Sequence, residues 1–343
     1  MWRRPVAAQQ PTTHNAMVPE SRQRRLIMIV AALAVGVLAA AQARINAQLA
    51  EQVGGGLFAA AISFGTGLIL VWAIVGARSD LRAAVASLPS TVRSGGLRRW
   101  HLLGGFGGAW LVTTQGLVVP AVGVTVFTVA VVAGQVSGSL FVDRAGLSPA
   151  GHMPLSIRRV LAAGLALLAV AVAGVESAGG DISWVAVLAV TAGLGVAVQQ
   201  AINGRVAAST HQPLAATGVN FLVGFTALFV LSLASIGIAV DEFLTWPDQW
   251  WLYLGGPIGV AFIALAAWAV RGVGVLVFGL LSIAGQLLGS VILDLAAPAE
   301  GITFGWPQWL ALGLIALATL IATNPGARSL RGRRLNGLGR RGE

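Results

Sequence analysis

The sequence contains no cysteine and no lysine, and it has few charged residues of either sign. The absence of cysteine excludes disulfide bonds and thiolate metal sites. Charged residues make up 10% of the 343 positions and hydrophobic residues 56%, and the mean hydropathy is +0.82. Soluble domains contain about 25% charged residues, so this composition excludes an ordinary soluble protein and indicates a polytopic membrane protein.

Long apolar stretches recur along the chain, and each is a candidate membrane-spanning helix. A helix needs about 20 mostly apolar residues to cross the hydrocarbon core of a bilayer. Ten spans are predicted on this basis: 26–46, 57–76, 102–118, 121–141, 157–175, 183–204, 214–236, 250–269, 272–293 and 308–323. Only LVVPAVG separates the third span from the fourth, so Pro120 is predicted to mark a very tight turn or an irregular hairpin.

Arginine is distributed unevenly between the loops, and this predicts the orientation. Nearly all of it lies in the termini and in the loops after even-numbered spans, whereas the opposite side carries only Arg44. Basic loops stay in the cytoplasm, so both termini are predicted to be cytoplasmic. The segments 1–25 and 324–343 are predicted to be tails, the second of them rich in arginine. The net charge of +10 is therefore assigned to membrane orientation, not to nucleic-acid binding.

The second half of the sequence repeats the first. AGQVSGSLFVD (133–143) matches AGQLLGSVILD (284–294) at an offset of 151, and GVLAAAQARINAQLA (36–50) matches GLGVAVQQAINGRVA (193–207) at an offset of 157. Glutamine, asparagine and aspartate are scarce in spans, so their alignment indicates a true repeat. The repeats are predicted to be 26–175 and 183–323. Five is an odd number of spans, so the second repeat is inverted in the membrane, as in many transporters.

Five-span units that begin with Q-x3-N and carry a later Phe-x2-Gly, doubled into ten spans, resemble the drug/metabolite transporter superfamily. More narrowly, they are similar to its YdcZ-type branch of inner-membrane exporters. The resemblance covers residues 26–323. It implies an EamA-like, all-α polytopic fold of ten transmembrane helices in two inverted five-helix repeats. It also implies a location in the inner (plasma) membrane and transport of a small-molecule substrate between the two halves.

Polar side chains inside the spans are the candidate substrate-binding residues. They are Gln135 and Gln286, the pairs Gln42–Asn46 and Gln199–Asn203 that each share one helix face, and Ser63 and Asn220. An amide in hydrocarbon needs partners, so Gln135 and Gln286 are predicted to face the bundle interior near the midplane. All of them also have a structural interpretation, as interhelical hydrogen bonds or helix caps. For Gln42, Asn46, Gln199 and Asn203 the structural interpretation is favoured, because polar residues near span ends are inexpensive.

Charged residues near the ends of the spans form two candidate ion pairs. Arg44 with Asp294 on the outer side, and Arg205 with Asp143 on the inner side, are candidate gates, each formed by an ion pair between equivalent helices. The alternative is that each charge is simply solvated, because exposed pairs contribute only about 0–1 kcal/mol.

Thr113, Thr114 and Gln115 have no polar counterparts in the second repeat, where Ala264, Leu265 and Ala266 stand. They are candidates for a functional asymmetry.

The sequence contains no recognisable catalytic or metal-binding motif, so the chain is predicted to be neither an enzyme nor dependent on a cofactor. No acidic residue, lysine or histidine lies in the central part of a predicted span, which argues against proton-coupled export of cationic drugs. The predicted function is export of a small neutral or zwitterionic metabolite by alternating access. A non-transporting membrane scaffold and a small-solute channel are the alternatives. The coupling ion stays open, as does the choice between a monomer and a homodimer.

The predicted topology can be tested with reporter fusions. A reporter fused after Glu343 is expected to report a cytoplasmic location, because the Arg-rich tail follows an even number of spans. A reporter in the 176–181 loop is expected to report an external location. A C-terminus found outside would contradict both the number of spans and the inversion of the second repeat.

Overall fold

The structure is a computed structural model that describes residues 22–147, 156–177, 184–236, 246–273, 275–297 and 305–323. The described residues form helices and no strand. The elements are α1 (Arg22–Gln52), α2 (Gly56–Ala77), α3 (Ser79–Arg93), η1 (Arg99–Gly104), α4 (Gly105–Arg144), α5 (Ile157–Ser177), α6 (Trp184–Thr210), α7 (Pro213–Ile236), η2 (Trp250–Leu254), α8 (Gly255–Val273), α9 (Val275–Ala296) and α10 (Trp306–Thr323). The predicted C-terminal tail, and residues 1–21 of the N-terminal tail, lie outside the described residues.

The helices agree with the predicted spans and confirm the all-α polytopic fold. By length and composition, five helical stretches in the described part of the chain could cross a membrane: Leu26–Gln52, Gly56–Ala77, Arg99–Arg144, Trp184–Thr210 and Pro213–Ser235. The shorter apolar stretches Val160–Val172, Trp250–Ala266, Leu281–Ala296 and Trp306–Ile321 belong to α5, α8, α9 and α10. The third predicted span begins in η1, and the rest of it lies in α4 together with the fourth span.

The 40 residues of α4 contain the predicted hairpin, but its turn lies at Gly123 rather than at Pro120. Gly123 leaves the helical conformation, with φ 78° and ψ 167°, in a region that favours glycine because it has no Cβ. The chain reverses there. Before the turn, Gly104 lies against Asn203 and Gly107 against Gly195; after it, Gly134 lies against Val190 and Gly138 against Ala197. We call the two antiparallel parts α4a (105–122) and α4b (124–144).

The carboxylate of Asp294, near the end of α9, caps the start of α4b. Its Oδ1 accepts a hydrogen bond from the backbone N–H of Val124 at 3.0 Å, and its Oδ2 accepts one from Thr125 at 2.6 Å. The first amides of a helix have no partner within the helix, and the helix dipole favours a negative charge at this position. Asp294 thereby joins the second repeat to the hairpin of the first.

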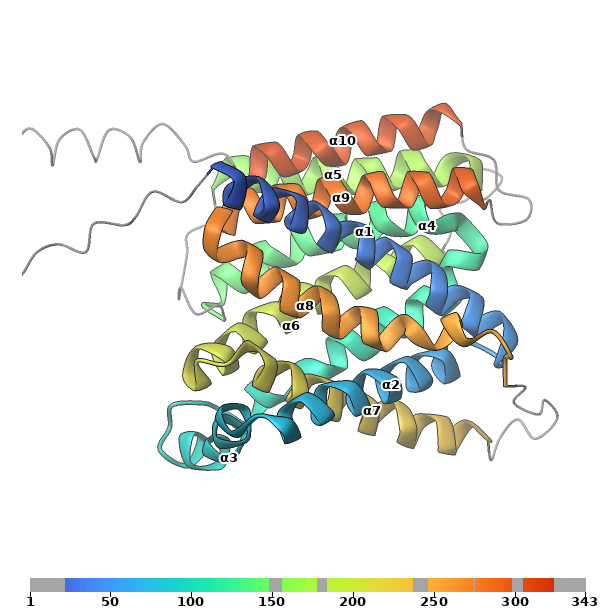
Figure 1. The fold of residues 1–343 in the computed structure, drawn as a ribbon. Helices are drawn as coiled ribbons and strands as arrows, with labels where there is room; N and C mark the ends of the chain where they lie inside the picture. The colour runs from blue at the N-terminus through green and yellow to red at the C-terminus, as the bar shows by residue number, and fades with distance from the viewer. Residues whose placement is uncertain are drawn as a thin grey trace, which may run out of the picture.

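The two repeats are interleaved rather than placed side by side. Helix α1 packs against α8 and α9 of the second repeat, and α6 packs against α4 of the first. The equivalent helices α2 and α7 lie together on one side of the bundle, and α5 and α10 lie together on the opposite side (Figure 1). The close contacts follow the sequence repeat: Gly36 meets the backbone of Gln286, and Gly193 meets the backbone of Gln135. The exact limits of the repeats, 26–175 and 183–323, stay a prediction.

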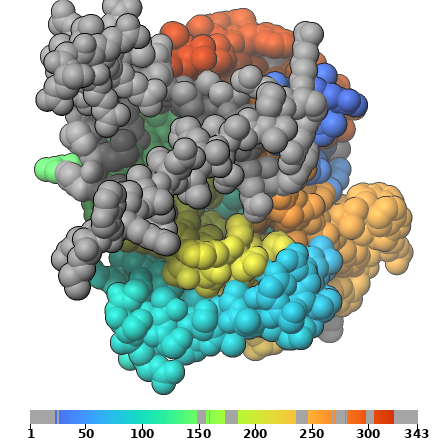
Figure 2. Space-filling model, turned by 60° about the vertical axis from the view of Figure 1, so that its left-hand side comes forward, coloured from blue at the N-terminus to red at the C-terminus, as the bar shows by residue number. Residues whose placement is uncertain are grey.

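Helix α3 is an element that the sequence did not predict, because its residues were assigned to the loop between the second and third spans. It is amphipathic, and it buries Leu81, Ala84 and Leu88 at one end of the bundle, where it packs against α6 and α7. Figure 2 looks onto this end, where α3 (cyan) lies beside the turn between α6 and α7 (yellow). We call it the α6–α7 end, and the other the far end.

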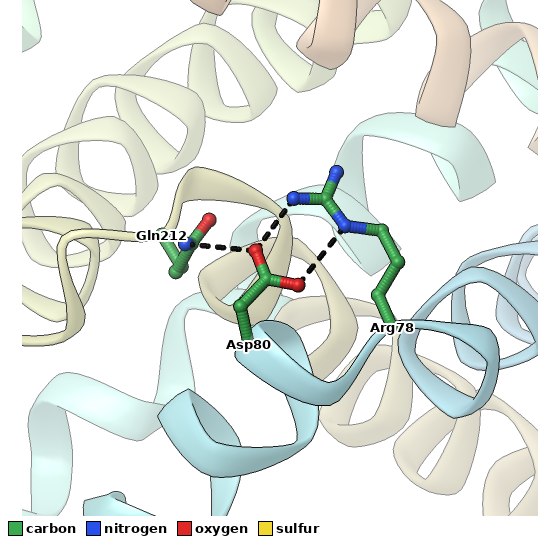
Figure 3. A network of polar contacts seen from close by, with 3 residues as sticks. All are labelled: Arg78, Asp80 and Gln212. Atoms are coloured by element: carbon green, nitrogen blue, oxygen red, sulfur yellow. Dashed lines mark hydrogen bonds and ion pairs between the residues drawn. The ribbon is translucent and has the colours of Figure 1, made fainter.

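A small polar network ties α3 to the α6–α7 turn (Figure 3). Arg78 donates to both carboxylate oxygens of Asp80, at 3.1 and 2.5 Å, and Gln212 donates to Asp80 at 3.2 Å. The hydrogen bond from Arg78 lowers the pKa of Asp80 from its usual value. The network is exposed to solvent, so it positions the turn without adding much stability.

The cap on α4b leads to a stability prediction. Asp294→Ala leaves two buried N–H groups without their partner, which costs on the order of 1–3 kcal/mol. The variant is therefore expected to have a lower Tm in detergent. Asp80→Ala, which removes an exposed carboxylate at the other end of the bundle, is the control and is expected to change the Tm little. Equal Tm values for the two variants would contradict the capping role.

Candidate substrate cavity

A cavity of about 300 Å³ lies inside the bundle, between α1, α2, α4a, α6, α7 and α8. Its polar lining includes Gln42, Ser63, Gln199, Asn203 and Asn220, all predicted from the sequence, together with Gln200 and Thr217, which were not. The apolar lining includes Phe64, Leu111, Val112, Val196, Phe221, Phe262 and Ile263. The lining residues carry no charge. A site of this kind can hydrogen-bond to a small solute and enclose its apolar part.

Phe64 and Phe221 form the middle of the cavity wall. Their ring centroids are 5.0 Å apart and the rings are tilted by 39°. Each ring packs on a glycine of the other repeat, Phe64 on Gly224 and Phe221 on Gly67. These are the residues of the Phe-x2-Gly motif. Sequence reasoning used the motif only to recognise the repeat, although its exact duplication was a signal for this contact.

The amides of the second repeat form one connected group. Gln199 and Asn203 on α6 both donate to Oδ1 of Asn220 on α7, at 3.0 and 2.9 Å. In the first repeat the equivalent amides have other partners: Gln42 donates to the carbonyl of Gly255 at 2.7 Å, and Asn46 donates to Gln115 at 2.6 Å. The two halves therefore share the Gln and Asn of their first helix but not the hydrogen bonds that these residues make.

Paired glycines allow these amides to approach the backbone of the opposite repeat. A Cβ on Gly255 would lie 2.1 Å from Oδ1 of Asn46, and a Cβ on Gly104, its equivalent, would lie 2.2 Å from Oδ1 of Asn203. No side chain fits at such distances. One turn further along, a Cβ on Gly259 or Gly108 would lie 2.8 or 3.0 Å from Nε2 of Gln42 or Gln199, respectively. The contact between the repeats is thus built twice from the same residue types.

The cavity reaches the α6–α7 end but not the far end. Four lining residues at the α6–α7 end are at least partly exposed: Gln200, Asn203, Ala207 and Pro213. Their equivalents at the far end, Ala43, Asn46, Ala50 and Gly56, are all buried. Asn46 is 0% exposed.

Close backbone packing closes the far end. Gly56 on α2 lies against the backbone of Thr113 and of Gly116 on α4a, and Ala50 on α1 also meets Gly116. Helix α1 packs along α4, whereas the equivalent pair α6 and α8 makes no comparable contact among the described residues. The same helices are therefore closed together in one repeat and held apart by the cavity in the other.

Gln135 and Gln286, the most central pair in the sequence, do not line this cavity. The backbone of Gln135 packs against Gly193 on α6, and that of Gln286 packs against Gly36 on α1. Both residues are half-buried. They lie where α4b and α9 approach the first helix of the opposite repeat, and their part in transport stays a prediction.

Three of the four candidate gate residues, Arg44, Arg205 and Asp294, bond to backbone groups at helix ends. Arg44 donates to the carbonyl of Ala297, past the end of α9, at 2.7 Å. Arg205 donates to the carbonyls of Gly146 and Leu147, past the end of α4b, at 2.6 Å each. Gly146 and Ala297 are repeat-equivalent. In the part of the chain that the structure describes, no ion pair joins Arg44 to Asp294, whose oxygens hold the start of α4b. The gates, including the pair of Arg205 with Asp143, stay predictions.

The chain is similar to a known protein family and to a solved structure. A family model described as "Putative inner membrane exporter, YdcZ" matches the chain twice, over residues 27–172 and 184–321, once for each repeat. A search of the curated proteins gave no match. A solved chain described only as the crystal structure of a protein is 23% identical, with a TM-score of 0.50. The match covers 92% of this chain and 99% of the other, and it supports the fold alone.

The glycine contacts can be tested by adding a methyl group. Gly104→Ala and Gly255→Ala are each expected to destabilise the protein by about 1–3 kcal/mol, the usual cost of overpacking. The measurement is the Tm in detergent. Gly164→Ala and Gly313→Ala are matched controls, because a Cβ there meets nothing within 4 Å and alanine favours the helix. A control variant as unstable as the cavity variants would contradict the assigned contacts.

Proposed function

Because the chain belongs to the YdcZ family of inner membrane exporters, we propose that it is a secondary transporter that exports a small neutral solute by alternating access. The cavity is the substrate site in this proposal. The observation that carries it is the difference in burial between equivalent residues at the two ends of the cavity. The family also points away from an enzymatic activity.

The inverted repeats provide the mechanism. If the two repeats exchange their conformations, α6 and α7 close against α8 while α1 and α2 separate from α4a. The cavity then opens at the far end and closes at the α6–α7 end, and the amides and phenylalanines between them stay accessible in both states. Repeat exchange of this kind accounts for transport without a new fold in either state.

The arginine distribution indicates which side of the membrane the open end of the cavity faces. The α6–α7 end carries Arg78, Arg82 and Arg205, and the far end carries Arg44. Under the positive-inside rule the α6–α7 end faces the cytoplasm. The structure then corresponds to the state that accepts a solute from inside the cell, as an exporter requires.

The lining favours an uncharged substrate over a zwitterionic one. Amides both donate and accept hydrogen bonds, so Gln42, Gln199, Gln200 and Asn203 suit hydroxyl, carbonyl or amide groups. A zwitterion would leave two charges without counter-charges in a low-dielectric site, which is costly. Phe64 and Phe221 provide a surface for the apolar part of the solute.

The alternatives fit the cavity less well. A channel needs a path that is open at both ends, whereas Asn46, Ala50 and Gly56 are buried at the far end. A membrane scaffold has no use for the same polar and glycine positions built twice around a cavity. Duplicated polar residues between two inverted halves are the arrangement expected of a transporter.

Export can be tested by comparing metabolites inside and outside a deletion strain and an overexpressing strain. The substrate is expected to accumulate inside the deletion strain and outside the overexpressing one. Gln199→Leu is expected to reduce its export about tenfold, the effect of roughly 1.4 kcal/mol of lost binding energy. Gln52→Leu, outside the cavity, is the control. If no metabolite differs between the strains, the proposal is wrong.

The same assay separates the two interpretations of the central pair. Gln135→Leu and Gln286→Leu are expected to reduce export while membrane expression stays normal. Normal export in both variants would assign these glutamines to helix packing alone. Loss of expression without a separate transport defect would lead to the same assignment.

A further inference from the structure

The hydrogen bond between Asn46 and Gln115 exists in only one repeat. Asn46 on α1 donates from Nδ2 to Oε1 of Gln115 on α4a at 2.6 Å. The two residues are 0% and 2% exposed. The bond crosses the contact that closes the far end of the cavity, one helical turn from Ala50 and close to the packing of Gly56 on Gly116.

The equivalent position in the second repeat cannot form this bond. Asn203 is the counterpart of Asn46, and the counterpart of Gln115 is Ala266, which has no acceptor in its side chain. Asn203 donates to Asn220 instead. The amide at position 115 is thus the polar asymmetry that the sequence singled out, and it lies at the end of the cavity that is closed.

We propose that Gln115 is a latch that holds the far end closed, and that its absence from the second repeat makes the state open at the α6–α7 end the resting state. The inference rests on the proposed alternating access. Opening the far end breaks the bond and exposes two buried amides, whereas closing the α6–α7 end forms no new bond between Asn203 and Ala266.

Ser63 provides the exchange partner for Asn46 when the far end opens. It is the equivalent of Asn220, and within the described residues its buried Oγ has no hydrogen-bond partner. A Cβ on Gly255 would lie close to both Ser63 Oγ and Asn46 Oδ1, at 2.7 and 2.1 Å, so the two side chains are neighbours. After an exchange of conformations, Asn46 donates to Ser63 as Asn203 now donates to Asn220.

The natural absence of cysteine makes a direct test simple. Ala47→Cys at the far end and Gly204→Cys, its equivalent in the cavity lining, report the two openings through their rates of reaction with a membrane-impermeant maleimide. Right-side-out and inside-out vesicles distinguish the two sides. Ala47 is 2% exposed, so its cysteine is expected to react slowly in the otherwise unchanged protein.

Removing the latch from the first repeat and adding its equivalent to the second should both favour opening of the far end over opening of the α6–α7 end. Gln115→Leu is expected to speed labelling of Ala47→Cys about tenfold and to slow that of Gly204→Cys, because one net hydrogen bond no longer favours the closed far end. Ala266→Gln, which offers Asn203 a partner across the other end, is expected to slow labelling of Gly204→Cys. A double variant should reverse the preference.

Each outcome decides the proposal. Rates that rise at both cysteines indicate general loosening and overturn it, as does a lack of change in the Gln115→Leu and Ala266→Gln variants. The labelling needs no substrate, so it is independent of the metabolite comparison. Reversed labelling without any exported metabolite would support the latch while refuting the exporter function. Export without reversed labelling would refute the latch alone.

Discussion

The bundle depends on one constraint, which is that polar groups in the hydrocarbon region have to find their partners inside the protein. Buried and half-buried amides and charges meet it through a side chain or a backbone group of a neighbouring segment. Gln42 uses the carbonyl of Gly255, Asp294 uses the first N–H groups of α4b, and Arg44 uses a carbonyl past the end of α9. These bonds require the close approach that glycine permits, so the interleaving of the repeats follows from the same constraint.

That constraint also explains why the polar residues lie where the repeats meet. A helix packed only against lipid or against apolar neighbours gains nothing from an amide. The amides on α1 and α6 lie against glycines of the opposite repeat, and they hydrogen-bond either there, as Gln42 does with the carbonyl of Gly255, or within their own repeat, as Asn46 does with Gln115. The cavity forms where this contact is incomplete, beside Gln199, Asn203 and Asn220. In the proposed function, the hydrogen-bonding groups of a substrate would take the place of the partners that the protein itself supplies at the far end.

Much of the fold could be predicted because the sequence is duplicated: Gln42 and Asn46 recur in the second half at a fixed offset. The hydropathy and the placement of arginine independently agree with the number of spans. Other features could not. The turn was predicted at Pro120, but proline is tolerated in transmembrane helices. The turn lies at Gly123 instead, because its positive φ favours glycine. Helix α3 is too short and polar to register as a span. Gln135 was predicted to face the bundle interior near the midplane, but depth in the membrane does not reveal which side chains border a cavity.

The contacts that the repeats share define the scaffold, and those that differ are the ones that would change in the proposed exchange of conformations. The glycine contacts at Gly104 and Gly255 and the packing of Phe64 on Phe221 appear in both halves, so an exchange of conformations leaves them in place. The bonds of Asn46 and Asn203 differ, with Gln115 in one half and Asn220 in the other. In the proposed exchange Asn46 would trade Gln115 for Ser63, whereas Asn203 would leave Asn220 and meet Ala266, which offers no acceptor. The present arrangement therefore keeps more hydrogen bonds than its exchange, and this difference is the physical basis of the proposed latch.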